Sequence, residues 1–276
     1  MAAFLIEDAC EPLRPPACEV KMITILITRN PDGPRKGGKA GCISSEEDTK
    51  TLLLREGLRE MGMRAYAELF RPDMIEHTED GKPFLAGLPG FHFNLSHSGD
   101  YIACAFSEEE VGLDLQEHSR PHTSVVRIAR RFFTAAEYEA ILALPSGESV
   151  TSPDNSPCRL ALFYRLWSIK EAYLKYLGCG LRGGMDGYLP EPFPDAGSAN
   201  ISYPDPLPDA GSARTGIPAF PPDRASENIL LRGQVRVLRE DPLLHRAEYA
   251  VIASPDNYTM VVSAAAVPRE ITVRLL

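Results

Sequence analysis

The 276-residue sequence lacks the features that mark several common classes of protein. Its six cysteines are scattered, and no two of them have the C-x-x-C spacing that is typical of zinc and redox sites. They suggest neither a zinc site nor a disulfide framework. Basic side chains are outnumbered, with 29 Lys and Arg against 38 Asp and Glu, which gives a net charge of -9. This balance argues against a broad nucleic-acid-binding surface.

Long apolar runs are also missing from the sequence. No stretch approaches the roughly 20 apolar residues that a membrane span needs, and the first residues lack the basic and apolar regions of a signal peptide. The Walker loop G-x-x-x-x-G-K-[ST] and the nucleophile elbow G-x-S-x-G are absent too. We therefore expect a cytoplasmic protein in a reducing compartment, without membrane or nucleic-acid partners.

The sequence does contain a mixture of helical and extended patterns. Hydrophobic residues make up 44% of the chain and charged residues 24%, which favours a globular protein. Apolar residues at steps of three and four predict helices, whereas short apolar or alternating runs predict strands. The predicted helices span residues 45–69, 125–133, 134–144 and 162–177, and the predicted strands span 22–28, 101–106, 111–116, 230–238, 248–254, 259–267 and 271–275. The fold class is therefore α+β, and the hairpin-length loops near the end of the chain indicate antiparallel strands.

One segment differs from the rest in composition. Residues 189–227 hold nine prolines, and the sequence Pro-Asp-Ala-Gly-Ser-Ala occurs twice, at 194–199 and 208–213. Such a segment has too little apolar content to offset the entropy lost on ordering. We predict a flexible, proline-rich insertion here.

The predicted helix at 162–177 carries charged groups beside an apolar stripe. Trp167, Glu171 and Lys175 recur at steps of four, so they lie on successive turns of one face. The simplest interpretation of Glu171 and Lys175 is a pair of opposite charges on a solvent-exposed helix face. The stripe itself consists of Leu162, Leu166, Ile169, Tyr173 and Leu177.

A second acidic residue lies inside the predicted strand at 111–116. Alternation of side chains directs Gly112, Asp114 and Gln116 to one face of this strand and its apolar residues to the other. Aspartate is disfavoured in strands, so its presence between leucines needs a reason. One reason is a charge that protects an edge strand from aggregation. The other is a carboxylate and an amide that serve a common site.

Asp114, Gln116 and Glu171 supply hard oxygen ligands. Two carboxylates and an amide suit Mg²⁺, which keeps several waters and binds beside substrate phosphates. Phosphoryl transfer needs little from a protein beyond positioning and charge stabilisation. Taken alone, these residues predict a Mg²⁺-dependent enzyme that acts on a phosphoanhydride. The groups available to contact its phosphates are Lys50, Lys82, His97 and Lys175.

Four motifs stand in a familiar order along the chain. They are Gly81-Lys82-Pro83, Asn94-Leu95-Ser96-His97-Ser98, Val111-Gly112-Leu113-Asp114-Leu115 and Trp167-Ser168-Ile169-Lys170-Glu171-Ala172-Tyr173-Leu174-Lys175. Together they resemble the 4'-phosphopantetheinyl transferases of the larger, Sfp-like type. The resemblance runs from about residue 45 to 265, apart from the insertion. It implies two similar α+β halves related by pseudo-twofold symmetry, at 1–110 and 111–276, with coenzyme A bound between them in a monomer.

The resemblance also implies a role for each matched residue. Asp114 and Glu171 look like the ligands of the catalytic Mg²⁺, for which Mn²⁺ is an alternative. Gln116 stands where many family members have Glu, and its amide can coordinate the ion or hold a ligated water. The residues implied to be catalytic are Asp114, Glu171 and Lys175. Those implied to contact coenzyme A are Lys50, Gly81, Lys82, Pro83, Ser96, His97 and Lys175.

The implied reaction is attack by a serine of an apo acyl or peptidyl carrier protein on the β-phosphate of coenzyme A, with release of 3',5'-ADP. Glu171, directly or through a metal-bound water, would take the serine proton. Two alternatives use the same ligands and stay open at this point. One is a Mg²⁺-dependent hydrolase of coenzyme A or of another nucleotide pyrophosphate. The other is a coenzyme A-binding protein without catalytic activity.

Overall fold

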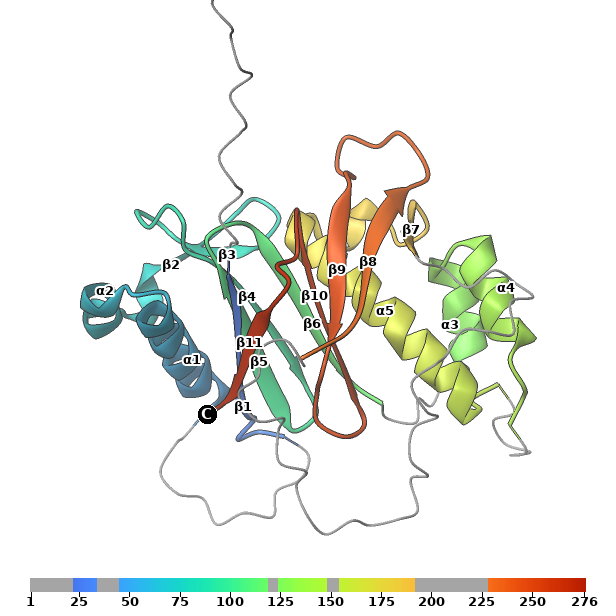
Figure 1. Ribbon diagram of the computed structural model, residues 1–276, viewed down its shortest axis with the longest axis horizontal. Helices are drawn as coiled ribbons and strands as arrows, with labels where there is room; N and C mark the ends of the chain where they lie inside the picture. Colours follow the sequence, from blue (N-terminus) through green and yellow to red (C-terminus); the bar gives the residue numbers. More distant parts are fainter. Residues whose placement is uncertain (1–21, 34–44, 119–123, 148–153, 192–227) are drawn as a thin grey trace, which may run out of the picture.

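The computed structural model describes residues 22–33, 45–118, 124–147, 154–191 and 228–276 (Figure 1). The insertion predicted at 189–227 lies outside the described residues from position 192 onward. Helices and strands are mixed along the chain, which confirms the α+β class. None of the helices in these ranges is both long and apolar enough to cross a membrane.

Two larger sheets form the centre of the structure. The first has four strands in the order β11 (Ile271–Leu275), β1 (Ile23–Arg29), β5 (Tyr101–Ser107) and β4 (His92–Ser98). The second has five strands in the order β6 (Val111–Glu117), β10 (Tyr258–Ala264), β9 (Ala247–Ile252), β8 (Ile229–Val237) and β7 (Tyr188–Glu191). A separate small sheet pairs β2 (Ile75–His77) with β3 (Pro83–Leu85).

The expectation of antiparallel strands holds for the second sheet but fails for one pair in the first. There, β11 runs parallel to β1, with Ile271 opposite Ile23. The reason is that the chain leaves the second sheet after β10 and crosses to the far edge of the first, where it does not return as a hairpin.

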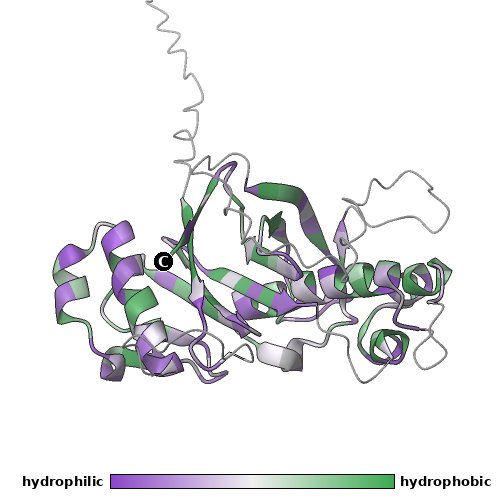
Figure 2. Ribbon diagram, turned by 90° about the horizontal axis from the view of Figure 1, so that it is seen from below, coloured by the Kyte–Doolittle hydropathy of each residue, from purple (hydrophilic) through white to green (hydrophobic). Residues whose placement is uncertain are grey.

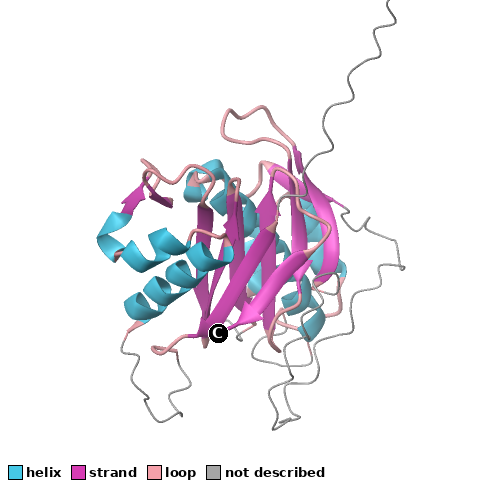
Figure 3. Ribbon diagram, turned by 60° about the vertical axis from the view of Figure 1, so that its left-hand side comes forward, coloured by secondary structure: helices cyan, strands magenta, loops and turns pink. Residues whose placement is uncertain are grey.

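Helices cover the outer face of each sheet (Figure 3). On the first sheet these are α1 (Glu46–Glu60) and α2 (Arg64–Leu69), followed by the short helix η1 (Pro72–Met74). On the second sheet this is α5 (Pro157–Leu177), followed by the short helix η2 (Gly180–Gly183). Helices α3 (Val125–Phe132) and α4 (Ala135–Ala143) pack against α5. Both hydrophilic and hydrophobic residues occur along α1 and α2, as expected of helices with one exposed face (Figure 2).

The predicted helix at 45–69 is in fact two helices. Ser45 caps the first as its sequence suggests, because its hydroxyl accepts a hydrogen bond from the Asp48 N–H. The helix ends at Glu60, and Gly62 then adopts a left-handed conformation with φ of 76°. The chain changes direction at this glycine, so Leu69 does not continue the apolar face and is 70% exposed.

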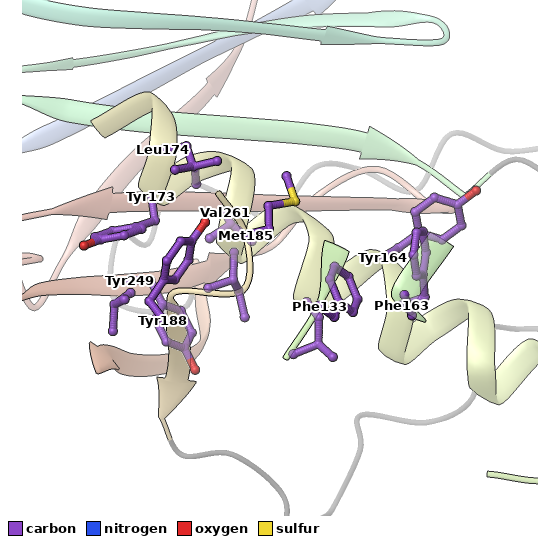
Figure 4. Close-up of a cluster of buried hydrophobic side chains, with 14 of the residues drawn as sticks. Phe133, Phe163, Tyr164, Tyr173, Leu174, Met185, Tyr188, Tyr249 and Val261 are labelled. Carbon is purple, nitrogen blue, oxygen red and sulfur yellow. The ribbon is translucent and has the colours of Figure 1, made fainter. Parts of the chain in front are cut away.

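Three apolar clusters hold these layers together. One joins α1 to the first sheet, through residues such as Leu54 and Phe106. A second fills the space between the facing sides of the two sheets, through residues such as Ile25 and Leu113. The third lies between the second sheet and helices α3 to α5 and includes Tyr173 (Figure 4). Helix α5 and strand β6 are therefore packed from both sides, and they carry the candidate catalytic residues.

Candidate active site

Helix α5 ends at Leu177 as the sequence predicts, but it begins at Pro157, five residues before the predicted range of 162–177. The Ser156 hydroxyl accepts a hydrogen bond from the Arg159 N–H, and Pro157 occupies the first turn, where its missing N–H costs nothing. Gly178 closes the helix in a left-handed conformation with φ of 71°. The predicted apolar stripe is buried from Leu162 to Tyr173.

Trp167 packs against aromatic rings and contacts no proposed ligand. Its ring centroid lies 6.1 Å from that of Phe132, 6.4 Å from that of Phe133 and 5.8 Å from that of Phe163. These rings come from α3, from the start of the next loop and from α5 itself. The tryptophan of the motif thus buttresses α5 against its neighbouring helix.

Strand β6 has the register that alternation predicts. Leu113 and Leu115 enter the core between the sheets, whereas Asp114 faces α5. The helix lies very close to the strand at Gly112, where an added Cβ would be 2.0 Å from the Ala172 carbonyl oxygen. The absence of a side chain at this position allows the close approach that brings α5 to Asp114.

Asp114, Lys175 and Ser96 form a connected group at this contact. The Lys175 Nζ donates to Asp114 Oδ1 at 2.8 Å and to Ser96 Oγ at 3.0 Å, and Ser96 Oγ donates to Asp114 Oδ1 at 3.3 Å. Asp114 is only 5% exposed, which rules out the interpretation of a solvated edge-strand charge. Its Oδ2 is buried and has no hydrogen-bond partner in the described part of the chain.

Glu171 lies one turn before Lys175 and is half-buried. Burial raises the pKa of its carboxyl, the charge of Asp114 raises this pKa further, and the charge of Lys175 partly lowers it. Burial is the larger of the two causes, and the contribution of Asp114 shows that its charge acts on Glu171. Glu171 and Lys175 are therefore not a simple exposed pair, because Lys175 pairs with Asp114.

The third candidate ligand, Gln116, lies further along β6. Its amide Nε2 donates to Ser98 Oγ at 3.4 Å and to the Glu117 carbonyl at 3.2 Å. Its side-chain oxygen therefore stays available as a ligand atom for a cation. Among the described residues, no group of three or more His, Cys, Asp or Glu side chains is arranged to hold a metal. The candidate set comprises two carboxylates and an amide, and the unpartnered Asp114 oxygen and the raised pKa of Glu171 both fit a hard divalent cation.

His97 and Lys50 lie on the other side of β4. His97 is exposed, and Lys50 forms an ion pair with Glu46 at 2.7 Å in the first turn of α1. The hydrogen bond from Lys50 is the main cause that lowers the pKa of Glu46, and the charge of His97 lowers it further. The structure thus groups Lys50 and His97 around Glu46, and it does not bring them to Asp114.

Lys82 lies at the end of α5. Its Nζ contacts the Glu110 carboxylate and donates to the carbonyls of Val111 at 3.3 Å and Tyr176 at 3.0 Å. It thereby caps one of the last carbonyls of α5, while Gly81, with φ of 84°, forms the turn before it and Pro83 begins β3. Burial alone would raise the pKa of Glu110, but hydrogen bonds from His92 and Lys82 lower it to about 2.

Two sets of residues near the site were part of the quoted motifs but were given no role in the sequence analysis. Asn94 and Ser98 on β4 accept hydrogen bonds from β6, and the signal that would reveal them is the polar alternation N-x-S-x-S. Lys170, inside the W-x-x-K-E motif, is fully buried and lies 2.9 Å from the fully buried Glu137. The Thr134–Glu137 capping box was predicted and is present, but the partner of its glutamate on α5 was not.

Comparison with known proteins points in the same direction. The model of the 4'-phosphopantetheinyl transferase superfamily matches residues 110–205. The 4'-phosphopantetheinyl transferase Sfp of Bacillus subtilis (strain 168) is 33% identical over 156 residues, which are 56% of this chain and 64% of that protein. The 4'-phosphopantetheinyl transferase psf-1 of Bacillus pumilus is 35% identical over 139 residues, which are 50% of this chain and 54% of that protein.

A eukaryotic protein supplies a further match. The L-aminoadipate-semialdehyde dehydrogenase-phosphopantetheinyl transferase of Xenopus laevis is 36% identical over 118 residues, which are 39% of this chain and 36% of that protein. The matched part of the chain thus spans less than two thirds of the length of each of these relatives. Together with the four motifs in their order, the matches show that this chain is similar to the 4'-phosphopantetheinyl transferase superfamily and, among its members, to proteins of the Sfp-like type.

Proposed function

We propose that this protein transfers the 4'-phosphopantetheine group of coenzyme A to a serine of an apo acyl or peptidyl carrier protein and releases 3',5'-ADP. The observation that carries the proposal is the group formed where α5 meets β6. Asp114 is held 2.8 Å from Lys175 and has one buried oxygen that finds no partner among the described residues, and its charge adds to burial in raising the pKa of Glu171 on α5. The ammonium group of Lys175 and the two carboxylates are thus placed to act on a phosphoanhydride.

Asp114, Gln116 and Glu171 would hold the Mg²⁺ ion in this proposal. The donor set is made of hard oxygens, and its two crowded carboxylates would be relieved by a divalent cation. When bound, the ion would neutralise charge on the pyrophosphate. The amide of Gln116 adds no charge to the site, so Asp114 and Glu171 would supply most of the attraction for the ion.

In this proposal Glu171 and Lys175 perform the proton transfer and the stabilisation of charge. The serine oxygen forms a bond to the β-phosphorus while the bond from this phosphorus to the oxygen of 3',5'-ADP breaks. The serine proton passes to Glu171, which would act as the general base. Lys175 donates to the pyrophosphate oxygens and offsets the charge that develops on the leaving group.

The contacts of coenzyme A extend to both sides of β4. Ser96 lies within the Asp114–Lys175 group, whereas His97 and Lys50 lie together near the start of α1, where they would meet a second phosphate. Gly81, Lys82 and Pro83 would contact the nucleotide near the end of α5. We further propose that the halves 1–110 and 111–276 are related by pseudo-twofold symmetry, that coenzyme A binds between them, and that a single chain is active.

The test is incubation of the purified protein with coenzyme A, Mg²⁺ and a panel of apo carrier proteins, followed by intact-mass measurement of each carrier. A gain of one phosphopantetheinyl group on a carrier supports the proposal. Free phosphopantetheine without a modified carrier would instead indicate the hydrolase. Calorimetric binding of coenzyme A without any turnover would indicate a protein that only binds it.

A further inference from the structure

The two sheets meet at β4 and β6, which are the end strands of their sheets among the strands described. No backbone hydrogen bonds join these two strands within the described residues; side chains of β4 join them instead. The Leu113 N–H donates to Asn94 Oδ1 at 2.9 Å, the Leu115 N–H to Ser96 Oγ at 3.0 Å, and the Glu117 N–H to Ser98 Oγ at 2.9 Å.

These three hydrogen bonds form a regular ladder. Each joins residues 19 apart in the chain, so both strands advance by two residues from one bond to the next and run parallel. The same three N–H groups point away from β10, because alternate residues of β6 face that neighbour. Without the side chains of β4, these buried donors would have no partner, which is costly.

The candidate metal ligands alternate with the bonds of this ladder along β6. Asp114 lies between Leu113 and Leu115, and Gln116 lies between Leu115 and Glu117. The ladder oxygens also touch the ligands directly. Ser96 Oγ lies 3.3 Å from Asp114 Oδ1 and Ser98 Oγ lies 3.4 Å from Gln116 Nε2.

We propose that the side-chain ladder of Asn94, Ser96 and Ser98 sets the position of Asp114 and Gln116 relative to α5, and that Asn94 and Ser98 are positioning residues for transfer. This inference rests on the proposed function for its catalytic part. Side-chain acceptors hold β6 at a separation and register that a backbone ladder does not provide. The ladder therefore fixes both ligands along β6 while α5 approaches from the other side at Gly112.

The first test measures amide hydrogen exchange at single residues in the full chain, without substrate or metal. Asn94→Ala should speed exchange of the Leu113 amide by about three- to tenfold and leave the Glu117 amide protected. Ser98→Ala should do the reverse. The control is Leu95→Ala on the same strand, whose side chain packs against the cluster beneath α1, so its loss weakens the fold without removing a ladder acceptor. Equal exchange changes at Leu113 and Glu117 in every variant would overturn the ladder.

The second test separates positioning from stability. Asn94→Ala and Ser98→Ala should lower kcat for carrier modification about tenfold or more, while the KM for coenzyme A changes little, because a misplaced ligand affects the transition state more than substrate binding. Ser98→Thr keeps the hydroxyl and should restore kcat. Selective exchange changes with an unaltered kcat would show that the ladder is structural only. If the wild-type protein modifies no carrier, the proposed function fails while the exchange result still stands.

Discussion

Gly112 offers the sharpest test of the geometry, because it lies where α5 crosses β6. A Cβ at this position would lie 2.0 Å from the Ala172 carbonyl oxygen and 2.3 Å from the Tyr176 nitrogen. Both are backbone atoms, so no side-chain rotation relieves the clash. In Gly112→Ala the helix and the strand must separate by about 1.4 Å, the difference between 2.0 Å and an ordinary contact of 3.4 Å.

This separation acts directly on the site. Ala172 is flanked on α5 by Glu171 and Lys175, and the Lys175 Nζ now lies 2.8 Å from Asp114 Oδ1. We expect Gly112→Ala to lower kcat/KM for carrier modification about 100-fold, the usual penalty for misplacing catalytic groups by about 1 Å. Overpacking should also lower the free energy of unfolding by about 1 to 3 kcal/mol.

The matched control is Gly233→Ala in β8. A Cβ there would lie 2.0 Å from the Glu191 carbonyl oxygen, so the crowding is equal, but it falls at the far edge of the second sheet from β6. Urea denaturation should show a comparable loss of stability in both variants. Only Gly112→Ala should lose activity, while Gly233→Ala should stay within about twofold of the wild type because distant sites act independently. Activity of Gly112→Ala within the same twofold range would refute the close packing of α5 on β6.

Three further predictions follow from single contacts. Gln116→Glu should lower the Mg²⁺ concentration needed for half-maximal rate, because it adds a third carboxylate to the site. Glu117→Ala, on the other face of β6, should change this concentration little. The opposite result in a Mg²⁺ titration would show that the assigned register of β6 is wrong. In metal-free buffer Glu171→Gln should raise the melting temperature at neutral pH, because a carboxyl whose folded pKa is raised above 4.5 costs stability once the pH rises through that range. An advantage of the variant that persisted below pH 4.5 would contradict this cause. In a separate assay with Mg²⁺ and coenzyme A, the same variant should abolish transfer. Lys170→Met should cost about 3 to 5 kcal/mol in urea denaturation because it leaves the buried Glu137 without its cation, and the second substitution Glu137→Gln should recover most of that loss.

Local features of the fold could be predicted well from the sequence. Strand and helix patterns reflect burial on one face, and caps such as Ser45 and Thr134 satisfy their own helix ends within three residues. The β6 register followed from side-chain alternation alone, and the apolar stripe of α5 followed from its helical period. Each of these predictions depends only on neighbours in the sequence.

Two predictions about the fold were wrong, and one contact of a predicted site residue had no signal in the sequence. The parallel pairing of β11 with β1 joins residues almost a full chain length apart, and no local pattern specifies it. The break at Gly62 was missed because an apolar period continues past it by coincidence, although Leu69 is in fact exposed. The position of Lys82, which caps α5 from a distant turn, is likewise a tertiary contact with no local signal.

The W-x-x-K-E-x-x-x-K motif combines two kinds of residue, and the structure separates them. Trp167 and Lys170 bind α5 to α3 and α4, whereas Lys175 pairs with Asp114 of β6 and Glu171 lies one turn before Lys175. Phosphoryl transfer requires accurate positioning more than covalent chemistry, so residues that fix the helix matter as much as those that touch phosphate. A buried ion pair is favourable only when its two groups are well aligned. The Lys170–Glu137 contact at 2.9 Å therefore constrains the rotation of α5 in a way that apolar packing alone does not. That rotation sets the position of Glu171 and Lys175 relative to Asp114, which gives a physical reason for a buried lysine directly before the glutamate proposed to be catalytic.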